Sequence, residues 1–431
     1  MNEEKAGQLW TKISWRILPL LFLSYIGAYL DRINVGFASK HLKSDLQFSD
    51  SVYGLGAGIF FLGYALFEIP SNMILEKVGA RRWIARIMVS WAVLSSAMAF
   101  VNSEKSFYIL RFLLGLAEAG FFPGIILYLT YWFPPSGRGR AISRFMTAIP
   151  LSGLIGAPLS GILLDLDGLG GLHGWQWMFL LEALPSLILG IYIFYFLPDG
   201  PANAAWLSPQ EKEQLAKQIQ MEEEKNHSTQ GAHWSEAFRS PRVWQMGAVY
   251  FFQIMGMYGI SLWLAEILHG AAMLSNIQTG LFAAIPFLLG TVAMAAWGWN
   301  SDRLGERRWH LVLGNLFGAC GFFLCCLQPG NFAVALTGMI IASMGVHACF
   351  GPFWALKTTL LGPALAAVGI ALINSLGNLG GFVGPYLMGY LRDLTGSLSF
   401  GLFLFGLSST IAAGLALTLS LTPVGKEKGP G

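Results

Sequence analysis

The sequence predicts an all-α polytopic membrane protein with twelve transmembrane helices in two six-helix halves. Of its 431 residues, 54% are hydrophobic and only 12% are charged, whereas soluble domains carry about 25% charged residues. Apolar runs of about 20 residues, long enough to cross a bilayer as helices, recur along the chain. Two sequence motifs also occur twice at one spacing, which indicates an internal repeat.

The apolar runs form two groups around one polar stretch. They cover about 17–39, 52–75, 83–101, 106–133, 140–165 and 175–197, and then about 243–268, 276–299, 309–328, 331–361, 366–391 and 397–421. We therefore expect an N-terminal half at 1–197, a cytoplasmic linker at 198–241 and a C-terminal half at 242–431.

The linker itself contains a helix signal. Ser208 and Glu211 have the spacing of a capping box, and Pro209 suits the first helical position. Leu215 and Ile219 indicate an amphipathic helix at the membrane surface, although a solvated spacer fits the same composition.

Lysine and arginine gather in alternate loops, which predicts the orientation. The loops expected inside hold Lys77, Arg81, Arg82, Arg86, Arg138, Arg140, Arg144, Arg303, Arg307 and Arg308, against Lys40, Lys43, Lys105 and Arg392 outside. Both termini should then be cytoplasmic. Because topology explains these basic residues, they do not indicate a nucleic-acid partner. The four cysteines lack paired metal-ligand spacing and are expected to be packing residues.

Asp31 and Arg32 stand side by side within the first apolar run. Charged residues inside a span are costly and mark a functional site by default, although a wet helix flank is the alternative. The two side chains lie about 100° apart on a helix, so they address different partners. Arg32 suits a substrate carboxylate, which a guanidinium matches in a two-point fork. Asp31 is then a candidate proton site.

The fourth run carries Arg111 and Glu118 on one helical face, about 10 Å apart along the axis. Its flanking residues are apolar, so this face should look into the protein. Glu118 there could take up and release a proton. The alternatives are a snorkelling arginine at the outer end and a buried pair that only holds helices together.

The repeat gives the chain its family resemblance. ILEKVGARRW and NSDRLGERRW place Glu76 and Asp302 226 positions apart, and GLIGAPLSG and GGFVGPYLMG place Pro158 and Pro385 227 apart. These duplicated loops resemble the major facilitator superfamily over the whole chain. YLDRINVGFA, LRFLLGLAEAGFFPG and INSLGNLGGFVGPYLMG resemble its anion:cation symporter branch, with bacterial tartrate, galactonate, hexuronate and phthalate-type permeases and the related vesicular glutamate and sialic acid carriers.

The resemblance implies a major facilitator fold and a function. It implies proton-coupled uptake of a small organic carboxylate, such as a sugar acid or hydroxy-dicarboxylate, by rocker-switch alternating access. The expected setting is the bacterial inner membrane, with a monomeric protein, no cofactor and the proton gradient as driving force. In that branch, residues matching Arg32, Asp31 and Glu118 serve anion binding and coupling, with Arg111 as the glutamate's charged partner. An exchanger without proton coupling, a membrane-embedded enzyme and a receptor are the alternatives.

Other residues complete the expected site. A substrate cage is predicted from Tyr29, Tyr64, Tyr258 (the repeat counterpart of Arg32), Trp354, Asn374 and Asn378. The resemblance implies that Trp354 and Asn374 line the cavity. For the tyrosines and the tryptophan, a belt at the membrane interface is the alternative. Lys357 is either a second anion anchor or a positive residue at a helix end. Glu76, Arg81, Arg82, Asp302, Arg307 and Arg308 are expected to form charge latches that hold the outward-facing state. Glu68 and Glu182 are further intramembrane acids, and Glu266 and His269 should be wet.

Overall fold

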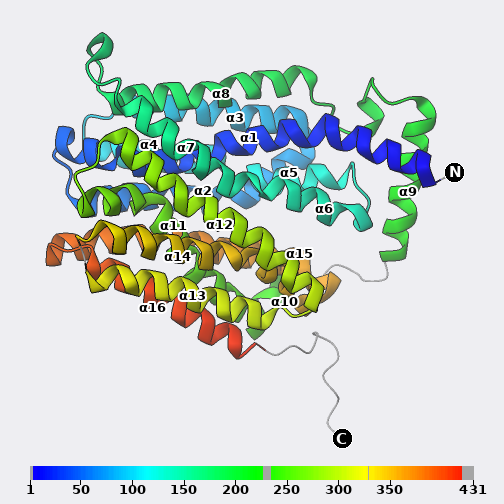
Figure 1. Ribbon diagram of the computed structural model, residues 1–431. Helices are drawn as coiled ribbons and strands as arrows, with labels where there is room; N and C mark the ends of the chain where they lie inside the picture. Colours follow the sequence, from blue (N-terminus) through cyan, green and yellow to red (C-terminus); the bar gives the residue numbers. More distant parts are fainter. Residues whose placement is uncertain (1–2, 227–233, 329, 420–431) are drawn as a thin grey trace, which may run out of the picture.

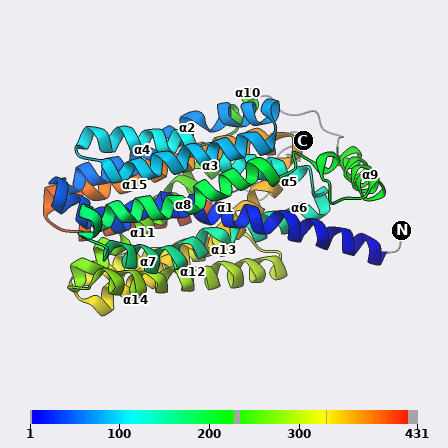
Figure 2. The same cartoon turned by 90° about the horizontal axis from the view of Figure 1, so that it is seen from above.

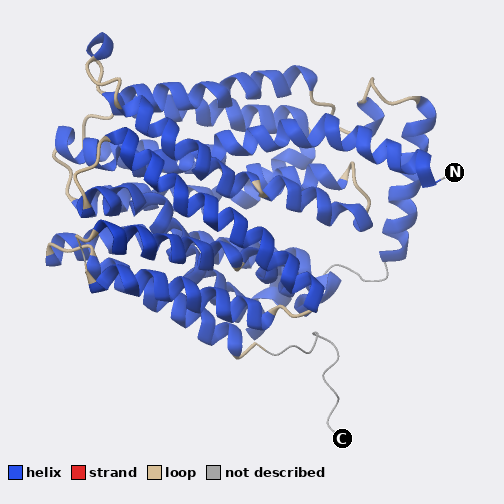
Figure 3. Cartoon of the chain, viewed as in Figure 1, coloured by secondary structure: helices blue, strands red, loops and turns tan. Residues whose placement is uncertain are grey.

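The computed structural model describes residues 3–226, 234–328 and 330–419. Within its helices, the side chains of 3–7, 135–136, 140, 143, 222–226, 234–235, 357–359 and 362–368 are not described. All regular structure in the described residues is helical (Figure 3), with no strand among them. We use first half and second half for residues 1–197 and 242–431.

Eight α-helices make up the described part of the first half. They are α1 (Glu3–Leu46), α2 (Asp50–Val78), α3 (Ala80–Ala97), α4 (Glu104–Glu118), α5 (Phe121–Thr130), α6 (Pro135–Met146), α7 (Ala148–Leu164) and α8 (Gly174–Phe196). The linker holds α9 (Pro209–Asn226) and α10 (Trp234–Arg239). The second half contains α11 (Pro241–Ala271), α12 (Asn276–Leu304), α13 (Arg308–Leu327), α14 (Phe332–Ala348), α15 (Phe350–Thr395) and α16 (Ser399–Leu417).

The long helices run side by side along one common direction in both views (Figures 1 and 2). By length and composition, eleven helical segments of the described chain are able to cross a membrane. The halves meet mainly where α2 packs on α15, α7 on α12 and α1 on α11. Small residues permit this approach: a Cβ at Gly54 would lie 2.5 Å from the Pro385 carbonyl oxygen.

Three predicted spans are not single helices. The fourth is divided into α4 and α5, the fifth into α6 and α7, and the tenth into α14 and the start of α15. Conversely, α15 contains the end of the tenth span and the eleventh. Tyr250 stacks on Phe353 at 4.8 Å between ring centroids, and a Cβ at Gly377 would lie 2.3 Å from the same tyrosine ring. Since residues 353 and 377 would be about 36 Å apart in a straight helix, α15 must double back between them.

The linker helix α9 crosses the end of the bundle near the N-terminus (Figure 1). The predicted capping box is confirmed: the Glu211 amide donates to Ser208 Oγ at 3.2 Å, and the Ser208 amide donates to Glu211 Oε2 at 2.7 Å. Lys12 Nζ also donates to Glu211 Oε1 at 2.8 Å, which lowers the pKa of Glu211. Leu215 is buried where α9 packs near α6, so one face of α9 is held against the bundle.

Ser208→Ala should loosen the start of α9. Loss of an N-cap side chain costs about 1 kcal/mol, which corresponds to a roughly fivefold rise in local opening. We expect trypsin to cleave after Lys212 and Lys217 about fivefold faster than in the wild type. Ser44→Ala, at an exposed serine of α1, is the control; equal rates in both variants would contradict a capping role.

Candidate functional site

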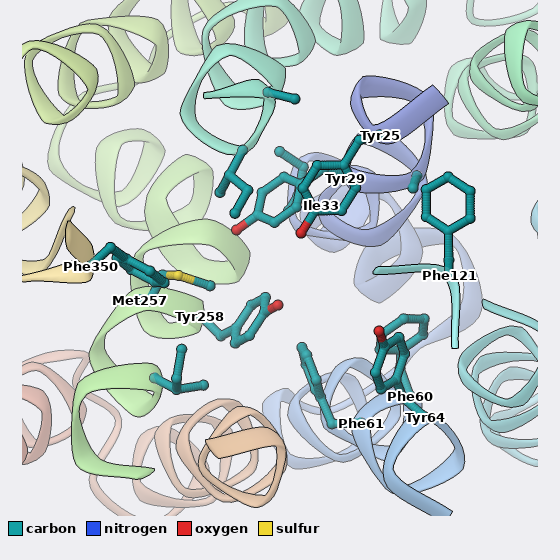
Figure 4. Close-up of a cluster of buried hydrophobic side chains, with 14 of the residues drawn as sticks. Tyr25, Tyr29, Ile33, Phe60, Phe61, Tyr64, Phe121, Met257, Tyr258 and Phe350 are labelled. Carbon is teal, nitrogen blue, oxygen red and sulfur yellow. The ribbon is translucent and has the colours of Figure 1, made fainter. Parts of the chain in front are cut away.

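A cavity of about 50 Å³ lies between the halves, room for only a few water molecules. It is lined by Tyr25, Tyr29, Arg32, Tyr64, Phe122, Met146, Ile149, Tyr250, Ile254, Met257, Tyr258, Phe350, Trp354, Asn374 and Asn378. Figure 4 shows aromatic rings of α1, α2 and α11 around this space. The predicted cage residues Tyr29, Tyr64, Tyr258, Trp354, Asn374 and Asn378 thus share one cavity with Arg32. The side chain of Lys357 lies outside the described residues.

Arg32 links the two halves at this cavity. Its Nη2 makes an ion pair with Glu118 of α4, and its Nη1 donates to the Tyr258 hydroxyl of α11 at 2.8 Å. Arg32 and Tyr258 are repeat counterparts, so equivalent positions of α1 and α11 face each other. The guanidinium carbon also lies 5.6 Å from the Tyr29 ring centroid and 5.3 Å from that of Tyr64, within cation–π range.

Glu118 stands at a break in its span. It is the last residue of α4, and Gly120 adopts a left-handed conformation with φ 84° before α5 begins. The glycine followed by Pro123 is a helix-stop signal that sequence reasoning could have used. A carboxylate at a helix C-terminus faces the negative end of the helix dipole. Arg32 provides the compensating charge, and Glu118 Oε2 has no hydrogen-bond partner among the described residues.

The expected pairing of Arg111 with Glu118 is wrong. Arg111 instead donates from Nε to the Gly56 carbonyl at 3.3 Å and from Nη2 to the Ala57 carbonyl at 3.2 Å, both in α2. Arg111 and Glu118 are nearly two helical turns apart on α4. The carbonyls of α2 lie within reach of Arg111, and the guanidinium of Arg32 lies within reach of Glu118. Arg111 therefore ties α4 to α2.

Asp31 faces away from Arg32, as their helical angle predicts. It is fully buried and accepts three hydrogen bonds: from Ser95 Oγ at 2.6 Å, from Ser186 Oγ at 3.0 Å and from Trp91 Nε1 at 3.1 Å. These donors belong to α3 and α8, and sequence reasoning did not single them out. A carboxylate that accepts several hydrogen bonds can remain buried in an apolar span.

A second charged group joins the halves near one end of the bundle. We call Lys43, Asp50, Glu266 and Arg392 the gate cluster. Glu266 Oε1 accepts from Lys43 at 2.7 Å and from Arg392 at 2.8 Å, and Asp50 Oδ1 accepts from the same cations at 2.6 and 3.1 Å. The expectation that Glu266 is wet is wrong: its side chain is 10% exposed because α1 and α15 cover it with two cations.

The expected latch residues lie at the ends of other loops, and none of their described ion pairs joins the first half to the second. Arg81 Nε lies 3.6 Å from an Asp199 carboxylate oxygen, and Arg307 Nη1 lies 2.5 Å from Asp302 Oδ1. Arg308 donates to the Leu419 carbonyl at 3.5 Å, whereas Glu76 and Arg82 are exposed. A latch between the halves therefore stays a prediction for another conformational state.

Comparison with known proteins decides the family. The model of the Major Facilitator Superfamily matches residues 21–385. The chain belongs to this superfamily. It is therefore an integral membrane transporter of a small molecule rather than an enzyme, and the predicted major facilitator fold is confirmed.

Individual relatives agree. The chain is 46% identical over 420 residues to a "Putative tartrate transporter" of Agrobacterium vitis, covering 97% of this chain and 93% of the relative. It is 44% identical over 398 residues to a "Putative metabolite transport protein NicT" of Pseudomonas putida, covering 92% and 91%. An inward-facing, occupied structure of a bacterial homolog of the lysosomal transporter Spinster has a TM-score of 0.76 at 17% identity, covering 93% and 95%. The predicted likeness to tartrate permeases is confirmed.

Proposed function

We propose that this transporter takes up a small organic carboxylate, such as a sugar acid or a hydroxy-dicarboxylate, together with protons. The observation that carries the proposal is Arg32, a buried cation in the wall of a cavity between the halves. Its guanidinium is held by one carboxylate, and its Nε–H has no partner among the described residues. A substrate carboxylate can replace Glu118 on this fork.

Coupling follows from that exchange of partners. An ionised Glu118 holds Arg32, so the substrate competes with it for the same guanidinium. When Glu118 takes up a proton, the ion pair is lost and Arg32 becomes available to the substrate. Asp31, which is adjacent to Arg32 on α1, is the second proton site in this proposal. Movement of the halves about the cavity then exposes proton and substrate to the other side.

We place the protein in the bacterial inner membrane with both termini cytoplasmic, acting as a monomer. No cofactor takes part, and the proton gradient drives transport. The printed name of the Agrobacterium vitis relative, a putative tartrate transporter, supports a carboxylate substrate.

Uptake by reconstituted protein tests the proposal. With labelled L-tartrate and an acidic exterior, we expect the protein to accumulate substrate inside the vesicles. The inside-to-outside ratio should rise about tenfold per unit of pH difference for each coupled proton. A protonophore should abolish this accumulation. Asp31→Asn and Glu118→Gln should each lose pH-driven accumulation. Intact accumulation in both variants would refute proton coupling through these acids. Exchange of internal for external tartrate without pH dependence would favour an anion exchanger.

A thermal-shift screen tests the substrate class. We expect stabilisation of the purified protein by hydroxy-dicarboxylates or sugar acids over simple monocarboxylates, because the cavity offers amide and tyrosine groups besides Arg32. Ligand at 100 times its Kd stabilises by about 2.7 kcal/mol, a clear shift in melting temperature. Stabilisation by none of these acids would remove the carboxylate assignment.

A further inference from the structure

Glu68 of α2 is a buried acid that the proposed coupling does not use. Its carboxylate accepts from Asn374 Nδ2 at 2.6 Å and from Asn378 Nδ2 at 3.3 Å, both on α15. The residue is only 6% exposed. Glu68 does not line the cavity, whereas both asparagines do. The carboxylate therefore lies directly behind two cavity groups and joins the first half to the second.

The two amides are the groups that a substrate carboxylate would need. Each asparagine amide can donate two hydrogen bonds, and hydrogen bonds to an ionised acceptor are roughly twice as strong as neutral ones. Glu68 accepts from both amides and turns them toward itself, as a substrate carboxylate could. An ionised Glu68 thus competes with the substrate for Asn374 and Asn378.

The charges at the cavity also indicate that an ionised Glu68 opposes binding of an anionic substrate. Arg32 is the one cation among the described lining residues, and it already pairs with Glu118. The groups facing Glu68 are Arg32 of α1, Tyr64 of α2, Tyr250 of α11 and the two asparagines of α15. Arg32 cannot neutralise Glu118, Glu68 and an incoming anion together. Binding a further carboxylate in this low-dielectric site is favourable only when an acid is neutral.

We propose that Glu68 is a further proton-binding residue of the transport cycle, and that its protonation releases Asn374 and Asn378 to the substrate. The proposal rests on the proposed function above. The proton enters as the hydrogen bonds of the carboxylate weaken, and it leaves when the substrate does. Asp31 differs in one respect: its three donors lie within the first half, whereas those of Glu68 belong to the second. Proton binding at Glu68 therefore acts directly on the contact between the halves.

Binding of L-tartrate by purified protein, measured from about pH 5.5 to about pH 7.5, tests this role. In the wild type we expect the Kd to rise with pH. Glu68→Gln resembles the protonated acid in shape and charge, so it should bind about tenfold more tightly than the wild type at the alkaline end and show a flatter pH profile. Glu68→Asp, which keeps a carboxylate, should retain the wild-type slope. Glu104→Gln, at an exposed acid of α4, should leave the profile unchanged.

The outcomes separate the two proposals. A Glu68→Gln profile parallel to the wild type, with only a lowered melting temperature, would make Glu68 a structural tie and overturn the inference. If the wild type does not bind tartrate, the proposed substrate fails, and infrared spectroscopy still examines Glu68 without a ligand. Acidification should then produce a protonated-carboxyl C=O band that is missing in Glu68→Gln. The same band in both proteins would refute proton binding at Glu68.

Discussion

Arg32→Lys is expected to raise the Kd for L-tartrate at least about 100-fold and to abolish measurable uptake. Lysine keeps the positive charge but loses the planar fork that bonds Glu118 and Tyr258, and that the proposed substrate would take over from Glu118. A hydrogen bond to a charged group contributes about 1.5–3 kcal/mol, and each 1.4 kcal/mol is a factor of ten in affinity, so loss of the two-point fork to a carboxylate corresponds to roughly 100-fold or more. Equilibrium binding and proteoliposome uptake measure the effect.

Arg86→Lys is the matched control, since Arg86 stacks on Trp83 of α3 and does not line the cavity. It should bind tartrate like the wild type. Arg32→Ala adds a second measure: Glu118 would be left buried without a cation, so the melting temperature should fall more than in Arg32→Lys. Affinity within threefold of the wild type in Arg32→Lys would exclude Arg32 as the anion-binding group.

Glu266→Gln should open the end of the bundle that the gate cluster closes. Loss of the Glu266 carboxylate leaves Asp50 as the carboxylate that Lys43 and Arg392 share. Because the cluster is partly exposed, we expect a discounted effect of about 2 kcal/mol, or about 30-fold in the ratio of the two states. The transport step in which this end of the bundle must close should also be slower in the variant than in the wild type.

Spin labels at Met273→Cys and Lys105→Cys, both exposed at this end, would report the change. The background should lack the native Cys320, Cys325, Cys326 and Cys349. We expect a longer-distance population to appear in Glu266→Gln and not in Glu213→Gln, whose exposed pair with Lys217 lies in the linker. Identical distance distributions in all three proteins would show that the cluster does not hold the end closed.

The sequence predicts much of the cavity because the repeat constrains it. Duplicated halves place equivalent positions of α1 and α11 about a common axis, so the counterpart of Arg32 was a specific residue, Tyr258, and the structure brings the two into contact. The spacing of Asn374 and Asn378 likewise predicted one shared helical face, and both line the cavity. In each case, periodicity along the chain carries the information.

Partners across helices did not follow from spacing. Arg111 and Glu118 share a face of α4, yet each bonds to a different neighbouring helix. Glu266 was expected to be wet because its position near a helix end says nothing of the cations on α1 and α15. The spacing of two residues along a helix determines on which side of that helix their side chains lie. Whether a charged side chain forms an ion pair depends on which group of a neighbouring helix lies within about 4 Å of it.

By itself, the sequence determined a membrane protein of two repeated helical halves, with Asp31, Arg32 and Glu118 buried within its spans. Apolar run length, loop charge and repeat offset are properties of one chain in order, so they need no tertiary information. Only the tertiary structure decided that Arg32 pairs with Glu118, that Asp31 is held by α3 and α8, and that Glu68 reaches the asparagines of α15. These contacts join residues far apart in the chain, and helix packing alone sets which side chains meet.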